Sequence, residues 1–350
     1  MLKDEMTHRE RVMGAIRHQP VDRLPTDYWG VAEITSMLMD KTGTKDMLGL
    51  AQKMNWDCPT WIEPVLTADR NGMWDIEMKR IPLPGGGGYY EEPAAFPLAK
   101  LETISEIEAN YRWPTTDMYD YSTIKAQCER SKKAGYATMG GYISLTYFYQ
   151  MIRGTEEMLL DLAADEELAE YIFSKIQEFA YAHTKKMLEA ADGCIDMTQV
   201  TDDFGTQHGL IMSEAMTDRY LRRYYDENIL LVKCYDAHVF HHDDGAMMAI
   251  LPWLMERGIE ILNPLQWHLP GWDLIKLKQD YGQRLCFHGG IDNQEVLPFG
   301  SSQDVRREVR RCVETLFSDK TGYILAPCHN IQAITPFENI MAMYDEAHKF

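Results

Sequence analysis

Residues 238–264, HVFHHDDGAMMAILPWLMERGIEILNP, contain the pattern from which the architecture follows. The run at 238–242 is short and largely apolar, and the stretch at 246–257 carries apolar residues at helical spacing. A second short apolar run occupies residues 259–264. A strand, a helix and a strand in this order predict one βαβ unit, whose two strands lie parallel in the same sheet.

The same alternation continues in both directions along the chain. Further strands are predicted at 137–141, 194–200, 284–290 and 322–327, and further helices at 165–190, 213–235, 271–281, 302–317 and 335–348. Strand–helix units that recur every 25–45 residues indicate a parallel sheet, and seven or eight such units favour a closed barrel over an open sheet. We therefore predict an α/β protein with a (β/α)8, or TIM, barrel that forms a single domain over residues 1–350.

Two additions to the barrel are predicted. The capping-box pattern Thr7-x-x-Glu10 precedes apolar residues at helical spacing and predicts an N-terminal helical extension, which the stretch RLPTDYWG follows as a short strand. Between about 72 and 100, four consecutive glycines at 85–88 precede YYEEP and predict a glycine-rich hairpin or lid insertion. We expect Glu91 and Glu92 to belong to a mobile cover, with an ordinary surface turn as the alternative.

The composition restricts the classes of partner. The chain has 35 Lys and Arg against 54 Asp and Glu, so its formal net charge is −19. Such a surface repels nucleic acid and anionic membranes, and it disfavours a strongly anionic substrate unless arginines gather locally. The seven cysteines show no paired short spacing, the first 20 residues lack an apolar signal segment, and no run of 18 apolar residues occurs. We expect a cytoplasmic protein with reduced thiols that binds neither nucleic acid nor a membrane.

Polar and ionisable side chains follow five successive predicted strands. In a barrel, the carboxyl ends of the strands converge on the face where active sites are built. Five such clusters in register therefore predict an active site at these strand ends. In chain order, the side chains are Asp202, Asp203, Gln207, His241, His242, Asp243, Asp244, Asn263, Gln266, His288, Asp292, Asn293, Cys328, His329 and Asn330.

His242 and Asp244 are candidate metal ligands. Side chains two residues apart in an extended segment face the same way, so an imidazole and a carboxylate could come together here. The adjacent His241 and His242 face opposite ways, and one of them is expected to point into the site. With Cys328 or His329 from the last strand, they would form a three-ligand zinc site with an open position. The alternative is that His242 and Asp244 hydrogen-bond each other and a substrate without a metal.

Acid–base roles are predicted for Asp202 or Asp203 and for His288. Burial would raise the pKa of either carboxyl and suit it to general acid or base catalysis, whereas in the alternative one caps a helix and the other forms a salt bridge. His288 precedes two glycines that let a ligand approach closely, although a packed core histidine would fit the same pattern. The neutral side chains expected to bind substrate are Gln207, Asn263, Gln266 and Asn330.

These motifs resemble the uroporphyrinogen decarboxylase superfamily, which includes corrinoid-dependent methyltransferases that act on methylated thiols, alcohols and amines. The likeness extends through most of the chain, and its last segment is the most specific. It is carried by ERVMGAIRHQPVDRLP, GGYISLTYFYQMIRG, VTDDFGTQ, FHHDDGAM, ERGIEILNPLQ, FHGGIDNQ and GYILAPCHNIQAITPFENIMAMY. The resemblance implies a (β/α)8 barrel.

Compared with the true decarboxylases, the chain keeps one active-site residue and lacks one substrate-binding segment. Their active-site histidine matches His329, and their catalytic tyrosine falls near Phe148, which places Tyr147 as a substrate contact. Their arginine-rich R-Q-A-G-R segment, which grips the carboxylates of the substrate, is replaced here by PTDYWGVAE. An octacarboxylate substrate is therefore disfavoured, because each lost charge-assisted hydrogen bond costs roughly 1.5–3 kcal/mol.

The methyltransferase branch binds zinc through an H-x-C motif and a cysteine after the last strand. Here the first motif has Asp244 in place of the cysteine, and His329 aligns with the last ligand beside Cys328. The resemblance implies a methyltransferase, closer to this branch, that moves a methyl group between a small molecule and a cobalamin carried by a separate corrinoid protein. It also implies a homodimer. The alternative is a metal-independent decarboxylase of a less anionic substrate.

Overall fold

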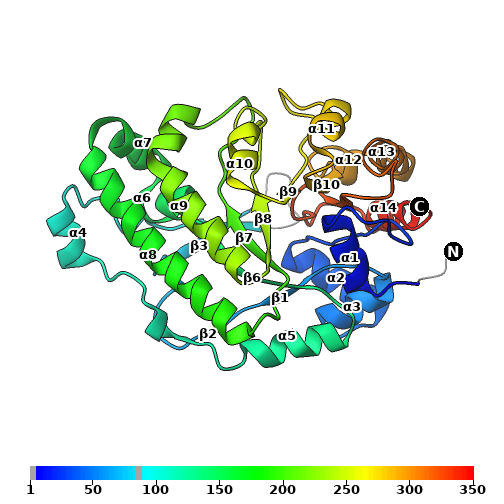
Figure 1. Ribbon diagram of the computed structural model, residues 1–350, viewed down its shortest axis with the longest axis horizontal. Helices are drawn as coiled ribbons and strands as arrows, with labels where there is room; N and C mark the ends of the chain where they lie inside the picture. Colours follow the sequence, from blue (N-terminus) through cyan, green and yellow to red (C-terminus); the bar gives the residue numbers. More distant parts are fainter. Residues whose placement is uncertain (1–4, 83–88) are drawn as a thin grey trace.

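The computed structural model describes residues 5–82 and 89–350 of the chain. Within them, seven parallel strands form one curled sheet in the order β1, β6, β7, β8, β9, β10, β11 (Figure 1). In that order, the strands span Thr60–Ile62, Thr138–Ser144, Met197–Thr201, His238–His242, Ile261–Asn263, Cys286–Ile291 and Tyr323–Pro327. Because all neighbours pair in parallel, the carboxyl ends of the strands open on the same rim.

The segment around Thr26 links the two edges of this sheet. Thr26 and Gly30 form parallel bridges with Leu325 and Ile331, in and just beyond β11. The carbonyl of Thr26 also accepts a hydrogen bond of 2.7 Å from the amide of Asp57, just before β1. The segment at 23–30, predicted as a short strand, forms only isolated bridges. It lies between the first and last strands of the sheet, and the arrangement is that of a TIM-barrel-like fold.

Helices cover the outer face of the sheet. Figure 1 shows α8 (Glu166–Ala191) and α9 (Glu214–Cys234) side by side over it. Helix α8 contacts β6, and α9 contacts β7 and β8. The other helices are α2 (Ala32–Thr42), α3 (Met47–Met54), α4 (Ile104–Asn110), α5 (Ile124–Lys133), α6 (Leu145–Arg153), α7 (Thr155–Ala164), α10 (Leu251–Arg257), α11 (Leu274–Tyr281), α12 (Val296–Phe299), α13 (Ser302–Leu316), α14 (Phe337–Ala347) and the 3-10 turn η1 (Thr116–Met118).

The predicted N-terminal helix, α1 (His8–Ile16), packs against the amino-terminal ends of the strands. Its capping box is confirmed, because the Thr7 hydroxyl accepts from the amide of Glu10 and the Glu10 carboxylate accepts from the amide of Thr7. Val12 and Met13 lie in the same buried cluster as Phe240 in β8. The helix thus fills the end of the barrel opposite the rim where the strands end.

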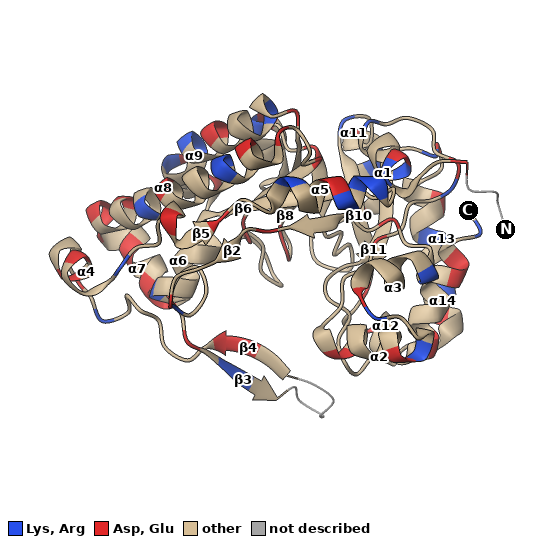
Figure 2. Ribbon diagram, turned by 90° about the horizontal axis from the view of Figure 1, so that it is seen from below, with Lys and Arg blue, Asp and Glu red and all other residues tan. Residues whose placement is uncertain are grey.

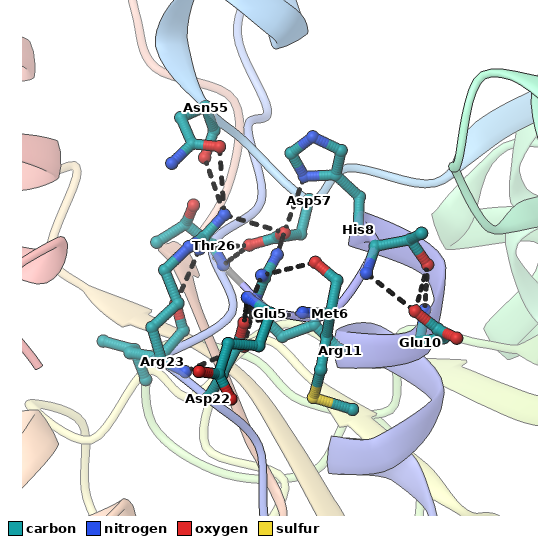
Figure 3. Close-up of polar contacts among 12 residues, drawn as sticks. Glu5, Met6, His8, Glu10, Arg11, Asp22, Arg23, Thr26, Asn55 and Asp57 are labelled. Atoms are coloured by element: carbon teal, nitrogen blue, oxygen red, sulfur yellow. Dashed lines mark hydrogen bonds and ion pairs between the residues drawn. The ribbon is translucent and has the colours of Figure 1, made fainter. Parts of the chain in front are cut away.

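A buried ionic network joins this helix to the first strands (Figure 3). The carboxylate of Asp57 is fully buried and lies 2.6 Å from Nη1 of Arg11 and 2.7 Å from Nη1 of Arg23. It also lies 2.8 Å from Nδ1 of His8 and accepts the amide of Thr26 at 2.9 Å. One carboxylate therefore fixes α1, the 23–30 segment and the start of β1 relative to one another.

The predicted hairpin is confirmed by β3 (Met78–Pro82) and β4 (Tyr89–Pro93), which pair antiparallel and project from the rest of the molecule (Figure 2). Glu91 pairs with Arg80 and Glu92 with Lys79 across the hairpin, so its acidic charges are partnered by bases of the facing strand. The glycines at 85–88 lie outside the described residues. A second small antiparallel pair joins β2 (Val65–Leu66) to β5 (Tyr119–Asp120).

The strands predicted from residue 137 onward are confirmed to within three residues at either end. The helix predicted at 246–257 was wrong at its start, because α10 begins at Leu251. Pro252 lies in the first turn of this helix, where its missing N–H costs nothing. None of the helices in the described ranges has the length and apolar character needed to span a membrane.

Candidate active site at the strand ends

Two adjacent histidines end β8 and point to opposite sides of the sheet, as predicted. His241 is fully buried, and its Nδ1 lies 2.8 Å from the carbonyl oxygen of Val200, to which it donates. Burial lowers the pKa of His241 to about 4, so it is a neutral core residue near pH 7. The side chain of His242 lies on the opposite face and is 13% exposed at the rim.

His242, Asp244 and His329 bring three potential metal ligands together. Oδ2 of Asp244 lies 3.8 Å from Nε2 of His242 and 3.6 Å from Nε2 of His329. The three ligand atoms lie within 4.8 Å of one another, and no other such group of His, Cys, Asp or Glu occurs in the described part of the chain. Oδ1 of Asp244 is buried without a hydrogen-bond partner among the same residues. We call these three residues the triad.

A chain of hydrogen bonds behind the triad orients His242. Its Nδ1 lies 2.5 Å from Oδ1 of Asn263, whose Nδ2 lies 2.7 Å from Nδ1 of His288. Nε2 of His288 in turn lies 2.9 Å from Oδ2 of Asp27. The Asn263 amide satisfies both rings when His242 donates from Nδ1 and His288 accepts at Nδ1, an assignment made from the network. It leaves the Nε2 lone pair of His242 facing Asp244.

Trp29 forms an aromatic wall beside the same histidines. Its ring stacks on His242 with centroids 5.5 Å apart and planes 20° apart, and it meets His329 edge-on at 6.3 Å. The indole Nε1 donates to Oδ2 of Asp27 at 3.1 Å. Trp29 and Asp27 both come from the segment at 23–30, so this segment restricts the orientation of the whole group.

Asp202 and Asp203 have different surroundings. Asp202 is 1% exposed and accepts hydrogen bonds from Ser144, Thr146, Tyr147 and Tyr225. Two of these donors are the amides of the second and third residues of α6, so Asp202 caps the start of that helix. Burial raises its pKa, and these hydrogen bonds oppose the rise.

Asp203 lies beside the triad. Its Oδ1 accepts from the backbone amide of Asp244 at 3.3 Å. Burial raises the pKa of Asp203, and the carboxylate of Asp244 adds to the rise while His242 opposes it. A carboxyl with a raised pKa next to the triad is suited to holding or accepting a proton.

Cys328 and His329 are adjacent in sequence, but their side chains have different surroundings. Sγ of Cys328 is buried and lies 3.2 Å from the carbonyl of Leu265, and burial raises the pKa of this thiol well above its usual range. His329 is the residue that joins the triad. Burial lowers the pKa of His329, although Asp244 opposes the shift.

A cavity of about 790 Å³ opens beside the triad, with Asp244 and His329 in its wall. The predicted substrate-binding residues Gln207 and Gln266 also line it. Gly205 lets the loops meet here, because a Cβ on this residue would lie 2.2 Å from the carbonyl oxygen of Asp244. The remaining wall residues are Thr206, Gly245, Asn293, Gln294, Pro298, Phe299, Gln332 and Ile334.

The other predicted site residues surround this group in different ways. Asn263 and His288 lie behind the triad in the hydrogen-bond chain. The carbonyl of Asn330 accepts from Asn293 and Gln332, and Tyr147 lies half-buried in the first turn of α6.

From the sequence we predicted no role for Asp27, Trp29 or Gln332. For the first two a signal was present, because the strand predicted at 23–30 also ends in polar and aromatic residues.

Comparison with known proteins identifies the family. The sequence model of the family described as Uroporphyrinogen decarboxylase (URO-D) matches residues 104–350. The chain belongs to the uroporphyrinogen decarboxylase family. The matched part of this family member contains the whole triad, whereas Asp27 and Trp29 precede it.

Among solved structures, this family member is similar to a methyltransferase from Methanosarcina mazei, with a TM-score of 0.69, 17% identity and 99% of each chain covered. At that identity the match shows a shared fold. A D-psicose 3-epimerase, solved in the presence of D-fructose, matches with a TM-score of 0.40 and 10% identity over 67% of this chain and 83% of its own. No curated protein sequence matches the chain at a significant level.

Proposed function

We propose that this family member is a single-domain enzyme over residues 1–350 that transfers a methyl group between a small molecule and a corrinoid carried by a separate protein, with zinc bound by His242, Asp244 and His329. The observation that carries the proposal is the convergence of three ligand atoms at the barrel rim. The cavity beside them supports it, because none of its described lining residues is a lysine or arginine that could grip a polycarboxylate.

The triad fits a zinc ion by distance and by chemistry. Tetrahedral zinc holds nitrogen and oxygen ligands at about 2.0–2.1 Å, which places them roughly 3.3–3.4 Å apart. The separations of 3.6 and 3.8 Å between Asp244 Oδ2 and the two imidazole nitrogens lie close to this value. The Asn263 contact leaves Nε2 of His242 as the lone-pair nitrogen, as a ligand requires. A His/Asp/His set is harder than a thiolate set but still suits zinc.

A bound zinc would supply Lewis-acid chemistry that lowers the pKa of a thiol or polarises an ether or amine. The chain's own residues would then position the substrate and exchange protons with it. Asp203 would hold or accept the substrate proton at the carboxylate oxygen that does not bond the Asp244 amide. Asp202 would position Tyr147 by capping α6. Trp29 would exclude water from one side of the two histidines.

The corrinoid is assigned to a separate protein because the sequence has no H-x-D-x-x-G segment in the surroundings that cobalamin binding needs. We also propose that the enzyme acts as a homodimer, the commonest symmetric assembly. Sedimentation measures this directly, and a monomer would remove the dimer from the proposal while leaving the site unchanged.

The activity is tested with methylcobalamin, added zinc and a series of thiol acceptors under anaerobic conditions. We expect the absorbance of methylcob(III)alamin to be replaced by that of cob(I)alamin as the thiolate takes the methyl group, leaving a thioether. Asp244→Asn should abolish the change, whereas His268→Ala, at a half-exposed histidine outside the triad, should retain it. Absence of any change with every acceptor, together with release of CO2 from a carboxylated substrate, would favour the metal-independent decarboxylase.

A further inference from the structure

Several side-chain amides line the cavity beside the triad. Five of its lining residues are Gln207, Gln266, Asn293, Gln294 and Gln332. Asp244 is the one acidic residue among the described lining residues, and none of them is a lysine or an arginine. The wall therefore offers mainly neutral hydrogen-bonding groups.

In three of these amides, one of the two polar side-chain atoms has a hydrogen-bond partner in the protein and the other, which we call the open atom, has none in the described part of the chain. Oε1 of Gln266 accepts from the amide of Gly245, which leaves its Nε2 as a donor. Nδ2 of Asn293 donates to the carbonyl of Asn330 at 3.2 Å, which leaves its Oδ1 as an acceptor. Nε2 of Gln332 donates to the same carbonyl at 3.0 Å, so its Oε1 is a second acceptor. Among the described residues, no protein group meets these three open atoms.

Two of the three side chains that carry the open atoms are largely buried. Gln266 is 9% exposed and Asn293 is 8% exposed, yet both line the cavity. Burial limits the movement of both side chains, and a site with fixed donors and acceptors rejects molecules that cannot satisfy them. One open donor and two open acceptors match a primary carboxamide, which offers a carbonyl oxygen and an NH2 group.

We propose that this cavity binds a carboxamide group of its ligand, and that Gln266, Asn293 and Gln332 select carboxamide over carboxylate. A carboxylate has no donor for Oδ1 of Asn293 or for Oε1 of Gln332. The selection acts at the triad itself, because Asp244 and His329 belong to the same wall.

The source of the carboxamide rests on the proposed function. A corrin ring carries carboxamide side chains around its rim, and a corrinoid presented to the triad would bring them to this wall. A small amide substrate would bring the same group without a corrinoid. Binding measurements distinguish the two sources and do not require methyl transfer.

The test compares cobinamide, whose corrin rim carries carboxamides, with cobyrinic acid, in which carboxylic acids replace them. Each is titrated into the full chain by calorimetry at about 0.5 M NaCl, where the Debye length is a few ångströms and the net charge is largely screened. We expect cobinamide to bind at least about tenfold more tightly. Acetamide and propionamide, tested alone and against acetate and propionate, form the second arm.

Gln266→Glu tests the open donor directly. A glutamate can still accept from the amide of Gly245, but it replaces the Nε2 donor with an oxygen. We expect cobinamide to bind about 10- to 100-fold more weakly. Gln332→Met, at a half-buried position, removes an acceptor without adding charge and should weaken binding by roughly tenfold. Gln52→Glu in α3 adds the same charge at an exposed position outside the cavity and should leave binding unchanged.

The outcomes separate cleanly. Tight cobinamide binding that depends on Gln266 and Gln332 supports the proposal with a corrin source, even in an enzyme that transfers no methyl group. Failure of both corrinoids to bind, with an amide-over-acid preference among the small molecules that Gln266→Glu abolishes, supports it with a small-molecule source. Equal binding of amide and acid forms, or binding that neither variant changes in a folded protein, would overturn it.

Discussion

Replacement of Asn263 by leucine should weaken metal binding without removing a ligand. The substitution keeps the approximate side-chain size but deletes the 2.5 Å contact to Nδ1 of His242 and the 2.7 Å contact to Nδ1 of His288. His242 then loses the partner that holds its Nε2 toward Asp244. Loss of a hydrogen bond behind a metal-bound histidine typically costs 10- to 100-fold in affinity, or about 1.4–2.7 kcal/mol.

Competition with a chromophoric zinc chelator measures this change, and urea unfolding reports the accompanying loss of stability. Glu260→Leu is the matched control, because Glu260 makes two hydrogen bonds at the other end of β8, to Nδ1 of His238 at 2.9 Å and to the amide of Val239 at 3.0 Å. We expect the control to lose stability and keep its zinc affinity. An Asn263→Leu protein that is folded and binds zinc as tightly as the wild type would refute the role of the hydrogen-bond chain.

Three further predictions concern groups around the site. Asp57→Leu should lower the free energy of unfolding by about 3–5 kcal/mol in urea titrations, because Arg11 and Arg23 lose their shared buried carboxylate; a loss below about 1 kcal/mol would contradict this. His183 is 4% exposed, and burial lowers its pKa to about 4, below the value near 6.5 of the unfolded chain. Its contribution to the free energy of unfolding is therefore fully present above about pH 6.5 and is lost as pH falls toward 4. His183→Gln should therefore flatten the fall in unfolding free energy between pH 6.5 and 4 by up to about 1.4 kcal/mol per pH unit, and identical slopes in both proteins would contradict it. Asp202→Ala should lose about 2–4 kcal/mol of stability through α6 while its zinc affinity stays within about twofold, and loss of zinc with unchanged stability would place Asp202 in the site instead.

Much of the fold could be predicted because its determinants are local. Each strand from β6 to β11 is a short apolar run between amphipathic helices, and the capping box of α1 is a four-residue pattern. The residues that link the two edges of the sheet could not be predicted, because Thr26, Asp57 and Leu325 are far apart in the sequence. The start of α10 was misplaced because apolar spacing alone ignored the preference of Pro252 for the first turn.

The position of the site at the strand ends and the directions of its side chains could be predicted, but their hydrogen-bond partners could not. Strand alternation separated His241 from His242 correctly, since only the backbone period is needed. It could not decide between Asp202, which contacts the start of α6, and Asp203, which contacts the loop after β8. The link from His242 to Asp27 was also hidden, because four separate segments contribute to that chain of hydrogen bonds.

The most direct test of the triad is the zinc content of the protein purified without added metal, beside His242→Ala and His329→Ala variants shown to be folded by circular dichroism. We expect about one zinc per wild-type chain and its loss in both variants, because each variant lacks one of the three ligands. A folded wild-type protein that contains no zinc and takes none up on titration, or variants that retain their zinc, would contradict it.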